Sequence, residues 1–211
     1  EAIIRIGEKR GDDNQKAFGY MVLGDSIAIS GNRLDKAWEM QQKGAALFLE
    51  NGNILGWAKT TIGRVGICIE KDAVEDTFAQ AATALEFFKR YHHLDLFVRL
   101  SYNMMRLLNE IGQFDDALDI FHAAFAVTET LEENREMHLL ILYNNAGITY
   151  WQKGEFNKAC DCLYHAKDMA ALLNKGESVN IILTNIAYIE SMRGNYNKAL
   201  DLAHGIIDNS K

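Results

Sequence analysis

The sequence predicts an all-α fold, a right-handed superhelical solenoid built from antiparallel helix pairs. The first observation behind this prediction is a short turn segment that recurs about every 40 residues and closes at Ala37, Thr77, Ala117, Ala159 and Ala199. The second is that apolar residues between these turns recur at intervals of three and four, as the buried face of a helix requires. Similarity at a fixed period indicates a repeat protein in which each unit packs on its neighbours.

The turn segment is clearest from Gly154 to Ala159, where it reads Gly-Glu-Phe-Asn-Lys-Ala. Matching copies begin at Gly31, Gly112 and Gly194. A degenerate copy occupies residues 71–77. Glycine suits the position just past a helix because the left-handed conformation costs it little, and a short polar residue can cap the next helix. The closing alanine lets two helices approach closely, so the segment predicts a helix–turn–helix.

The first helices follow from the turns that bound them. Residues 1–10 resemble the end of a helix from a preceding unit, since Gly11 and Asp12 follow them as later turns follow later helices. Residues 65–69 are the most strand-like stretch, but they fall at a helix position of the second unit. The expected helices in this half are 14–30, 33–50, 54–70 and 73–91.

The later helices have the clearest periodicity. Ala117, Phe121 and Ala124 are spaced at four and three, and Leu139 and Leu142 continue the same pattern in the next unit. No stretch alternates with a period of two for long enough to predict a sheet. The expected helices in this half are 94–111, 114–131, 135–153, 156–173, 178–193 and 196–208.

We therefore expect one array over residues 1–211. It begins at Glu1 instead of Met, so we expect it to be part of a longer protein. The array divides into the end of a preceding repeat at 1–13 and helix-pair repeats at 14–53, 54–93, 94–133, 134–176 and 177–211.

Composition narrows the class of protein. The chain has no proline, 48% hydrophobic residues and a formal net charge of −7, which fits a globular chain with ample core material and argues against a surface for nucleic acid. No apolar stretch approaches the roughly 20 residues that span a bilayer, and no secretory signal is recognisable. Three cysteines, an odd and sparse number, are typical of a reduced cytoplasmic protein. We expect no contact with membranes or nucleic acid.

Catalytic and metal-binding patterns are weak. Cys160 and Cys162 point apart on a helix, and Cys162 with His165 supplies only two of the three or four ligands that zinc needs. The His92-His93 pair falls at a predicted turn. No nucleophile elbow, zinc-protease, phosphate-loop or dinucleotide motif occurs. We expect a protein that is not an enzyme and has no cofactor or metal.

The fourth unit resembles a tetratricopeptide repeat. Tyr143, Ala146, Gly147 and Tyr150 precede the turn at the family spacing, and Leu163 and Ala166 follow it. The units are longer than the family's usual length of about 34 residues, and the terminal proline of the family is missing. Longer, proline-free units resemble the sensor or docking arrays of large bacterial transcriptional activators of the maltose-activator type, of kinesin light chains and of pheromone-sensing regulators.

The resemblance implies that the first helix of each pair lines a concave, ligand-binding face. The residues carried over to that face are Arg99, Tyr102, Arg106, Asn109, Asn144, Ile148, Trp151 and Tyr188. Arg99, Tyr102 and Arg106 share one helix face and can hold a carboxylate, or the arginines can pair with local acids or sit in solvent. Trp151 and Tyr188 can instead pack within the array. Apolar face positions such as Ile181 allow either a hydrophobic ligand track or a tightly wound, partly buried inner face.

The resemblance also implies a function in binding. We expect a scaffold or sensor module that binds a protein or peptide segment, within a larger bacterial signal-transduction or transcription-regulatory protein. One alternative is a regulatory or oligomerisation domain that controls a linked ATPase, cyclase or phosphatase domain. Another is self-association through uncapped ends.

Overall fold

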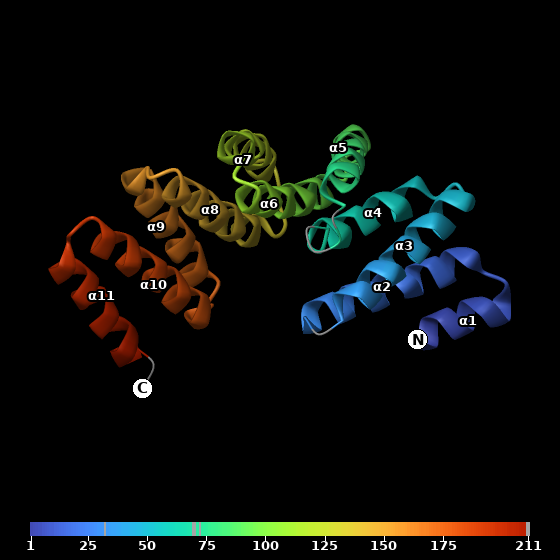
Figure 1. Ribbon diagram of the computed structural model, residues 1–211, viewed down its shortest axis with the longest axis horizontal. Coiled ribbons are helices and arrows are strands. Elements are labelled where there is room, and N and C mark those ends of the chain that lie inside the picture. Colours follow the sequence, from blue (N-terminus) through green and yellow to red (C-terminus); the bar gives the residue numbers. More distant parts are fainter. Residues whose placement is uncertain (32, 69–70, 72, 210–211) are drawn as a thin grey trace. The chain divides into compact units, whose positions relative to one another are not determined.

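The computed structural model describes residues 1–31, 33–68, 71 and 73–209, and these form eleven α-helices and no strand (Figure 1). The predicted all-α class is confirmed. The helices are α1 (Ala2–Arg10), α2 (Asp13–Ser30), α3 (Leu34–Glu50), α4 (Ile54–Val65), α5 (Val74–Arg90), α6 (Leu94–Glu110), α7 (Phe114–Thr128), α8 (Arg135–Gln152), α9 (Phe156–Leu172), α10 (Gly176–Met192) and α11 (Tyr196–Asn209).

The recurring turn segment adopts one recurring backbone geometry. At the turn between α8 and α9, Gly154 has a φ of 79°, and the backbone N–H of Glu155 donates to the carbonyl of Tyr150 at 2.9 Å. The same bond runs from Asn195 to Glu190 at 2.9 Å in the turn between α10 and α11. These bonds satisfy carbonyls that the helix end leaves unpaired. The repeated sequence therefore corresponds to a repeated structural turn.

The expected helix 54–70 is wrong at its end, because α4 stops at Val65. The chain turns at Gly66, and Ile67 enters a core cluster with Ile27 and Met40 instead of continuing the helix. Burial of this isoleucine in the core outweighs the few remaining helical hydrogen bonds. Part of the expected helix, residues 69 and 70, lies outside the described residues.

The expected helix 114–131 is also too long, because α7 ends at Thr128. The hydroxyls of Thr128 and Thr130 donate to the carbonyls of Ala124 and Val127 at 2.8 and 2.7 Å. Such side-chain bonds compete with the helical ones and favour termination. The next helix begins after Asn134, which adopts the left-handed conformation with a φ of 58°.

Backbone contacts divide the chain into two compact units, Glu1–Leu107 and Leu108–Lys211. In the first unit α2 packs on α1 and α3, and α4 packs on α3 and α5. In the second unit α9 lies between α8 and α10, and α10 packs on α11. The single array, its repeat boundaries and its right-handed winding remain predictions.

Close helix packing in the second unit depends on one glycine. A Cβ atom at Gly147 of α8 would lie 2.7 Å from Cγ of Leu163 in α9. Leu163 is buried in the cluster that joins α8, α9 and α10, together with Ile182 and Ile186. The absence of a side chain at Gly147 therefore lets α8 and α9 approach each other, and this positions the surface described below.

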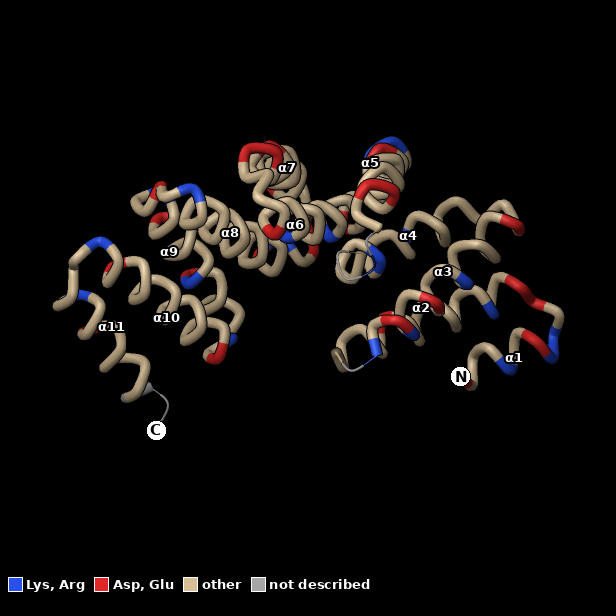
Figure 2. Tube along the Cα trace, viewed as in Figure 1, with Lys and Arg blue, Asp and Glu red and all other residues tan. Residues whose placement is uncertain are grey.

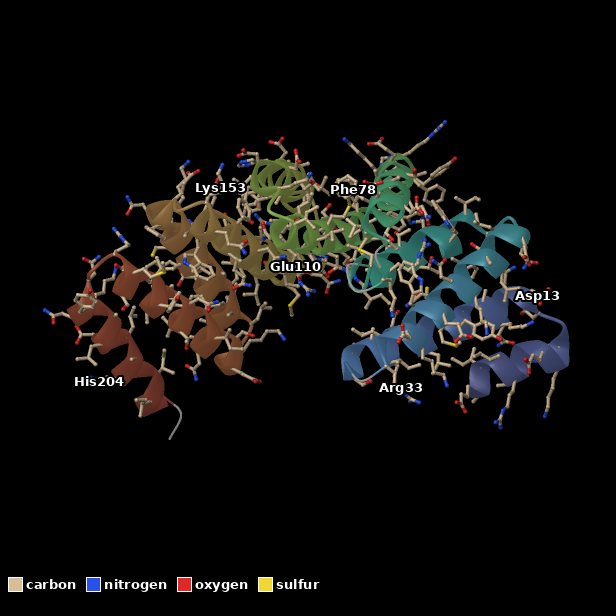
Figure 3. All side chains as sticks on the ribbon, viewed as in Figure 1. Asp13, Arg33, Phe78, Glu110, Lys153 and His204 are labelled. Atoms are coloured by element: carbon tan, nitrogen blue, oxygen red, sulfur yellow. The ribbon has the colours of Figure 1, made fainter. Side chains whose placement is uncertain are left out.

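No helix in the described part of the chain is both long and apolar enough to cross a membrane. Lys and Arg residues occur together with Asp and Glu residues on most helices, whereas α7 carries acidic residues and no Lys or Arg (Figure 2). Several of these charges pair locally: Lys153, labelled in Figure 3 at the turn after α8, pairs with Asp115 and with Glu155.

Candidate functional site

The second unit contains a groove between α8 and α10. It consists of two pockets. The larger, which we term the lysine pocket, has a volume of about 260 Å³ and is lined by Met137, Leu140, Ile141, Asn144, Lys175, Ser178, Ile181 and Ile182. The smaller, the tryptophan pocket, has a volume of about 120 Å³ and is lined by Gly147, Ile148, Trp151, Leu163, Asn185, Tyr188 and Ile189.

The tryptophan pocket brings together three of the predicted face residues, Ile148, Trp151 and Tyr188. The rings of Trp151 and Tyr188 meet edge to face with centroids 5.6 Å apart, a favourable aromatic geometry. The indole N–H of Trp151 donates to the sulfur of Met192 at 3.4 Å. Tyr188 nevertheless remains 56% exposed, so it packs within the unit and also presents its ring at the surface.

The lysine pocket contains the predicted Asn144 together with Ile141 and Ile181. Ile181 is exposed, although isoleucine is among the residues most often buried. Lys175 and Ser178 add polar atoms to the lining of this apolar pocket. An apolar pocket with a few polar groups is the usual form of a ligand site.

Three polar lining residues were not predicted, for different reasons. Asn185 lies four residues after Ile181 and three before Tyr188, so the helical spacing that selected those neighbours places it on the same face. Ser178 lies one helical turn before Ile181, so the same spacing places it on that face too. Lys175 lies in the turn before α10, where helical periodicity does not apply.

The predicted basic cluster of Arg99, Tyr102 and Arg106 belongs to the first unit. Arg99 and Arg106 of α6 are exposed, and Tyr102 between them is partly buried. Burial raises the pKa of Tyr102, and nearby Arg99 opposes that rise. Burial also raises the pKa of Asp25, against a hydrogen bond of 2.6 Å from Gln41 and the charge of Arg99. Arg99 is thus close to local polar groups of its own unit.

Asn109, the remaining predicted face residue, is buried. Its side-chain oxygen accepts a hydrogen bond of 2.9 Å from the hydroxyl of Thr149 in α8. Thr149 itself is fully buried and also donates to the backbone of α8. The carboxamide of Asn109 therefore contributes to packing between α6 and α8 within the second unit.

The α10 wall of the groove is joined to α11 through a buried carboxylate. Glu190 has no exposed side-chain surface, and it accepts hydrogen bonds from Asn195 at 2.6 Å and from Lys198 at 2.7 Å. Arg193 lies 3.3 Å from both carboxylate oxygens. Burial by itself opposes ionisation, but these hydrogen bonds and charges outweigh it and hold the pKa of Glu190 below its usual value. The carboxylate therefore stays ionised and fixes the end of α10 that bears Tyr188 and Met192.

The thiols of Cys160 and Cys162 are poorly suited to nucleophilic or metal-binding chemistry. Burial raises the pKa of Cys162 to about 11 and also raises the pKa of Cys160, so both thiols are protonated at neutral pH. A protonated thiol is a poor nucleophile and a poor metal ligand. No group of three or more His, Cys, Asp and Glu side chains within the described residues could hold a metal ion.

Comparison with known proteins links the chain to a regulator. No protein-family model matches the chain, so the tetratricopeptide resemblance rests on the repeat spacing and the turn residues. The chain is 27% identical over 145 residues to the transcriptional activator NprA of Geobacillus stearothermophilus. The match covers 66% of this chain and 34% of NprA, so the chain spans about a third of that relative's length.

Proposed function

We propose that this chain is a regulatory module of a transcriptional regulator and that it binds a protein or peptide segment in the α8–α10 groove. The distant similarity to a transcriptional activator supports the regulatory part of the proposal. The groove supports the binding part. Catalysis is not part of the proposed role, and any contact with DNA is assigned to another part of a longer protein.

The observation that carries the proposal is the alternation of apolar and amide groups along the groove. Asn144 lies between Ile141 and Ile148 on α8, and Asn185 lies between Ile181 and Tyr188 on α10. A carboxamide offers both donors and acceptors, which match the N–H and C=O groups of a peptide backbone. The apolar pockets on either side can bury peptide side chains, at about 25 cal/mol for each Å² removed from water.

A display experiment tests this proposal. A library of random peptides is selected against the full chain, and the enriched sequences are then measured against the Asn144→Ala and Tyr188→Ala variants. Both residues are at least partly exposed, so both variants are expected to stay folded, and Tyr188→Ala loses one aromatic contact with Trp151. We expect each substitution to weaken binding about tenfold, by loss of a hydrogen-bonding amide or of aromatic burial.

Tyr91→Ala is a matched control for Tyr188→Ala. Tyr91 follows α5 in the first unit and is 56% exposed, the same fraction as Tyr188. It also contacts an aromatic neighbour, with ring centroids 4.7 Å from Phe87. The control should bind the enriched peptides like wild type. Equal loss in both tyrosine variants, or no enriched sequence at all, would contradict the proposed site.

A further inference from the structure

The chain has seven methionines, all within the described residues, and Met192 is the one that is exposed. Its exposed fraction is 53%. The others are buried or partly buried: Met21, Met40, Met104, Met105, Met137 and Met169. Oxidation of a methionine needs a sulfur that solvent can reach. Met192 is therefore the methionine that a dissolved oxidant meets first.

The sulfur of Met192 has a defined place beside Trp151. Met192 is the last residue of α10, two residues after the buried Glu190 that anchors this end of the helix. The indole N–H of Trp151, on α8, donates to the sulfur of Met192 at 3.4 Å. A thioether sulfur is a weak acceptor with two lone pairs, and one hydrogen bond leaves the second pair for reaction. The contact therefore positions the sulfur without blocking it.

The thiols of the chain compete poorly for the same oxidant. Cys68 and Cys160 are buried, and burial raises the pKa of Cys162 to about 11. Thiols are oxidised through the thiolate, which Cys162 hardly forms at neutral pH. A thioether has no proton to lose, so its oxidation needs no such ionisation.

We infer that Met192 is a site of reversible oxidation by peroxides and that Trp151 transmits its oxidation state to the tryptophan pocket. A lone pair of the sulfur attacks one oxygen of the peroxide, an S–O bond forms and the O–O bond breaks. With hydrogen peroxide, the sulfur loses two electrons, and the departing hydroxide takes the proton of the transferred oxygen and leaves as water. The product is methionine sulfoxide, which methionine sulfoxide reductases convert back to methionine.

Oxidation changes the acceptor of the indole N–H. The sulfur of a sulfoxide is no longer a useful acceptor, whereas its oxygen is a strong one, so the N–H of Trp151 exchanges the sulfur for that oxygen or for water. Trp151 lines the tryptophan pocket and meets the ring of Tyr188 at a centroid distance of 5.6 Å, so a change at its N–H is felt inside the pocket. A polar sulfoxide at the edge of an apolar pocket weakens the binding of an apolar ligand group. This last step rests on the proposed function.

Limited treatment of the isotope-labelled full chain with hydrogen peroxide tests the modification. Peptide mass spectrometry should find about tenfold more sulfoxide at Met192 than at any other methionine, because Met192 is the exposed one. The indole N–H signal of Trp151 in NMR spectra, identified by its loss in Trp151→Phe, should move on oxidation. It should return to its first position after treatment with methionine sulfoxide reductases A and B.

Two methionine variants separate this effect from general oxidation of the chain. Met192→Leu keeps an apolar side chain without the sulfur, so the Trp151 signal should no longer respond to peroxide. Met21→Leu, in α2 of the first unit, is the matched control and should leave the response of Trp151 unchanged. Peptides enriched by display should bind the oxidised chain about fivefold more weakly than the reduced chain, and Met192→Leu equally before and after peroxide.

Several results would overturn the inference. An even spread of sulfoxide over the methionines removes the site, and a Trp151 signal that stays in place when Met192 is oxidised removes the transmission. A response that persists in Met192→Leu has the same consequence. If the signal moves but the enriched peptides bind both forms equally, the effect on binding is wrong and the proposed function stands. If display enriches no peptide, the proposed function is wrong, while the sulfoxide distribution and the Trp151 signal still decide the role of Met192.

Discussion

The α4–α5 hairpin and the α10–α11 hairpin each bury one charged side chain near the end of the first helix, with very different surroundings. Arg64 of α4 is 2% exposed and donates one hydrogen bond of 2.6 Å to Gln80, and its Nε and Nη2 groups have no partner among the described residues. Burial lowers the pKa of Arg64 to about 10. Glu190 of α10 has partners on the turn and on α11.

The difference follows from the length of the connection. Residues 193–195 join α10 to α11, so Asn195 and Lys198 lie only five and eight residues after Glu190. Residues 66–73 join α4 to α5, and Gln80 lies sixteen residues after Arg64. A short turn brings polar partners to a buried charge at little entropic cost. The length of the connection, and not burial alone, therefore goes with the number of polar partners that each buried charge finds within its hairpin.

The largest expected effect on stability is at Glu190, the buried charge that has several partners. Glu190→Gln should lower the free energy of unfolding by about 3 kcal/mol at pH 7, because the charge-assisted bonds from Lys198 and Arg193 are lost. Urea denaturation followed by circular dichroism measures this. Glu133→Gln, at an exposed turn, is the control and should change stability by less than about 0.5 kcal/mol. If Glu190→Gln also lowered the free energy of unfolding by less than about 0.5 kcal/mol, the proposed difference between the two hairpins would be contradicted.

The effect at Glu190 should also depend on pH. Its pKa in the folded state is below the value of about 4.3 expected when unfolded, so ionisation stabilises the fold above that pH. This stabilisation is lost as the pH falls through the lowered folded pKa. The stability difference between wild type and Glu190→Gln should therefore shrink steadily below about pH 4. A difference that is constant from pH 7 to pH 3 would mean that the carboxylate charge has no part in it.

Two glycines, Gly147 of the second unit and Gly66 of the first, should respond differently to alanine. Gly147→Ala should cost about 2 kcal/mol, because the new methyl group would collide with Leu163. Gly66→Ala should change stability by less than about 0.5 kcal/mol, because Gly66 has right-handed helical angles and its Cβ would meet only a carbonyl oxygen at 3.3 Å. Thermal denaturation of both variants measures the contrast, and equal losses would refute it.

The smallest effect is expected at the poorly partnered charge. Arg64→Met keeps most of the side-chain volume and removes a buried guanidinium that has one hydrogen bond. Replacing a buried charge by an apolar side chain is often neutral or stabilising. The free energy of unfolding should therefore fall by no more than about 0.5 kcal/mol, and it can rise. Urea denaturation at pH 7 gives the value. A loss as large as that of Glu190→Gln would show that the two hairpins do not differ.

Helix positions were predictable from the sequence wherever the turn segment is intact. The turns at Gly112, Gly154 and Gly194 end or start helices within a few residues of the expected bounds. The main error lies in the degenerate second unit, where the glycine is replaced by Lys71. There the burial of Ile67 decided the end of α4. The sequence pattern around residue 67 does not show whether burial in a core or further helical hydrogen bonds are the more favourable.

The candidate site was predictable in part. Helical spacing and the family resemblance identified Asn144, Ile148, Trp151 and Tyr188, which line the groove in the structure. The same reasoning selected Asn109, whose carboxamide is engaged with Thr149 instead. Whether a side chain on the correct face is open to a ligand depends on its neighbours from other helices, which a single helix pattern does not contain.

The sequence by itself determined the all-α class, the period of about 40 residues and the helix faces, because these depend on local turns and on residues three or four apart. The tertiary structure decided the two pockets, the partners of Glu190 and the presence of Lys175 and Asn144 in the lining of one pocket. Each of these depends on side chains from separate helices or turns that meet only after packing. The chemistry of the pockets and of Glu190 therefore depends on how far apart the helices lie. The spacing of residues along a single helix does not determine that distance.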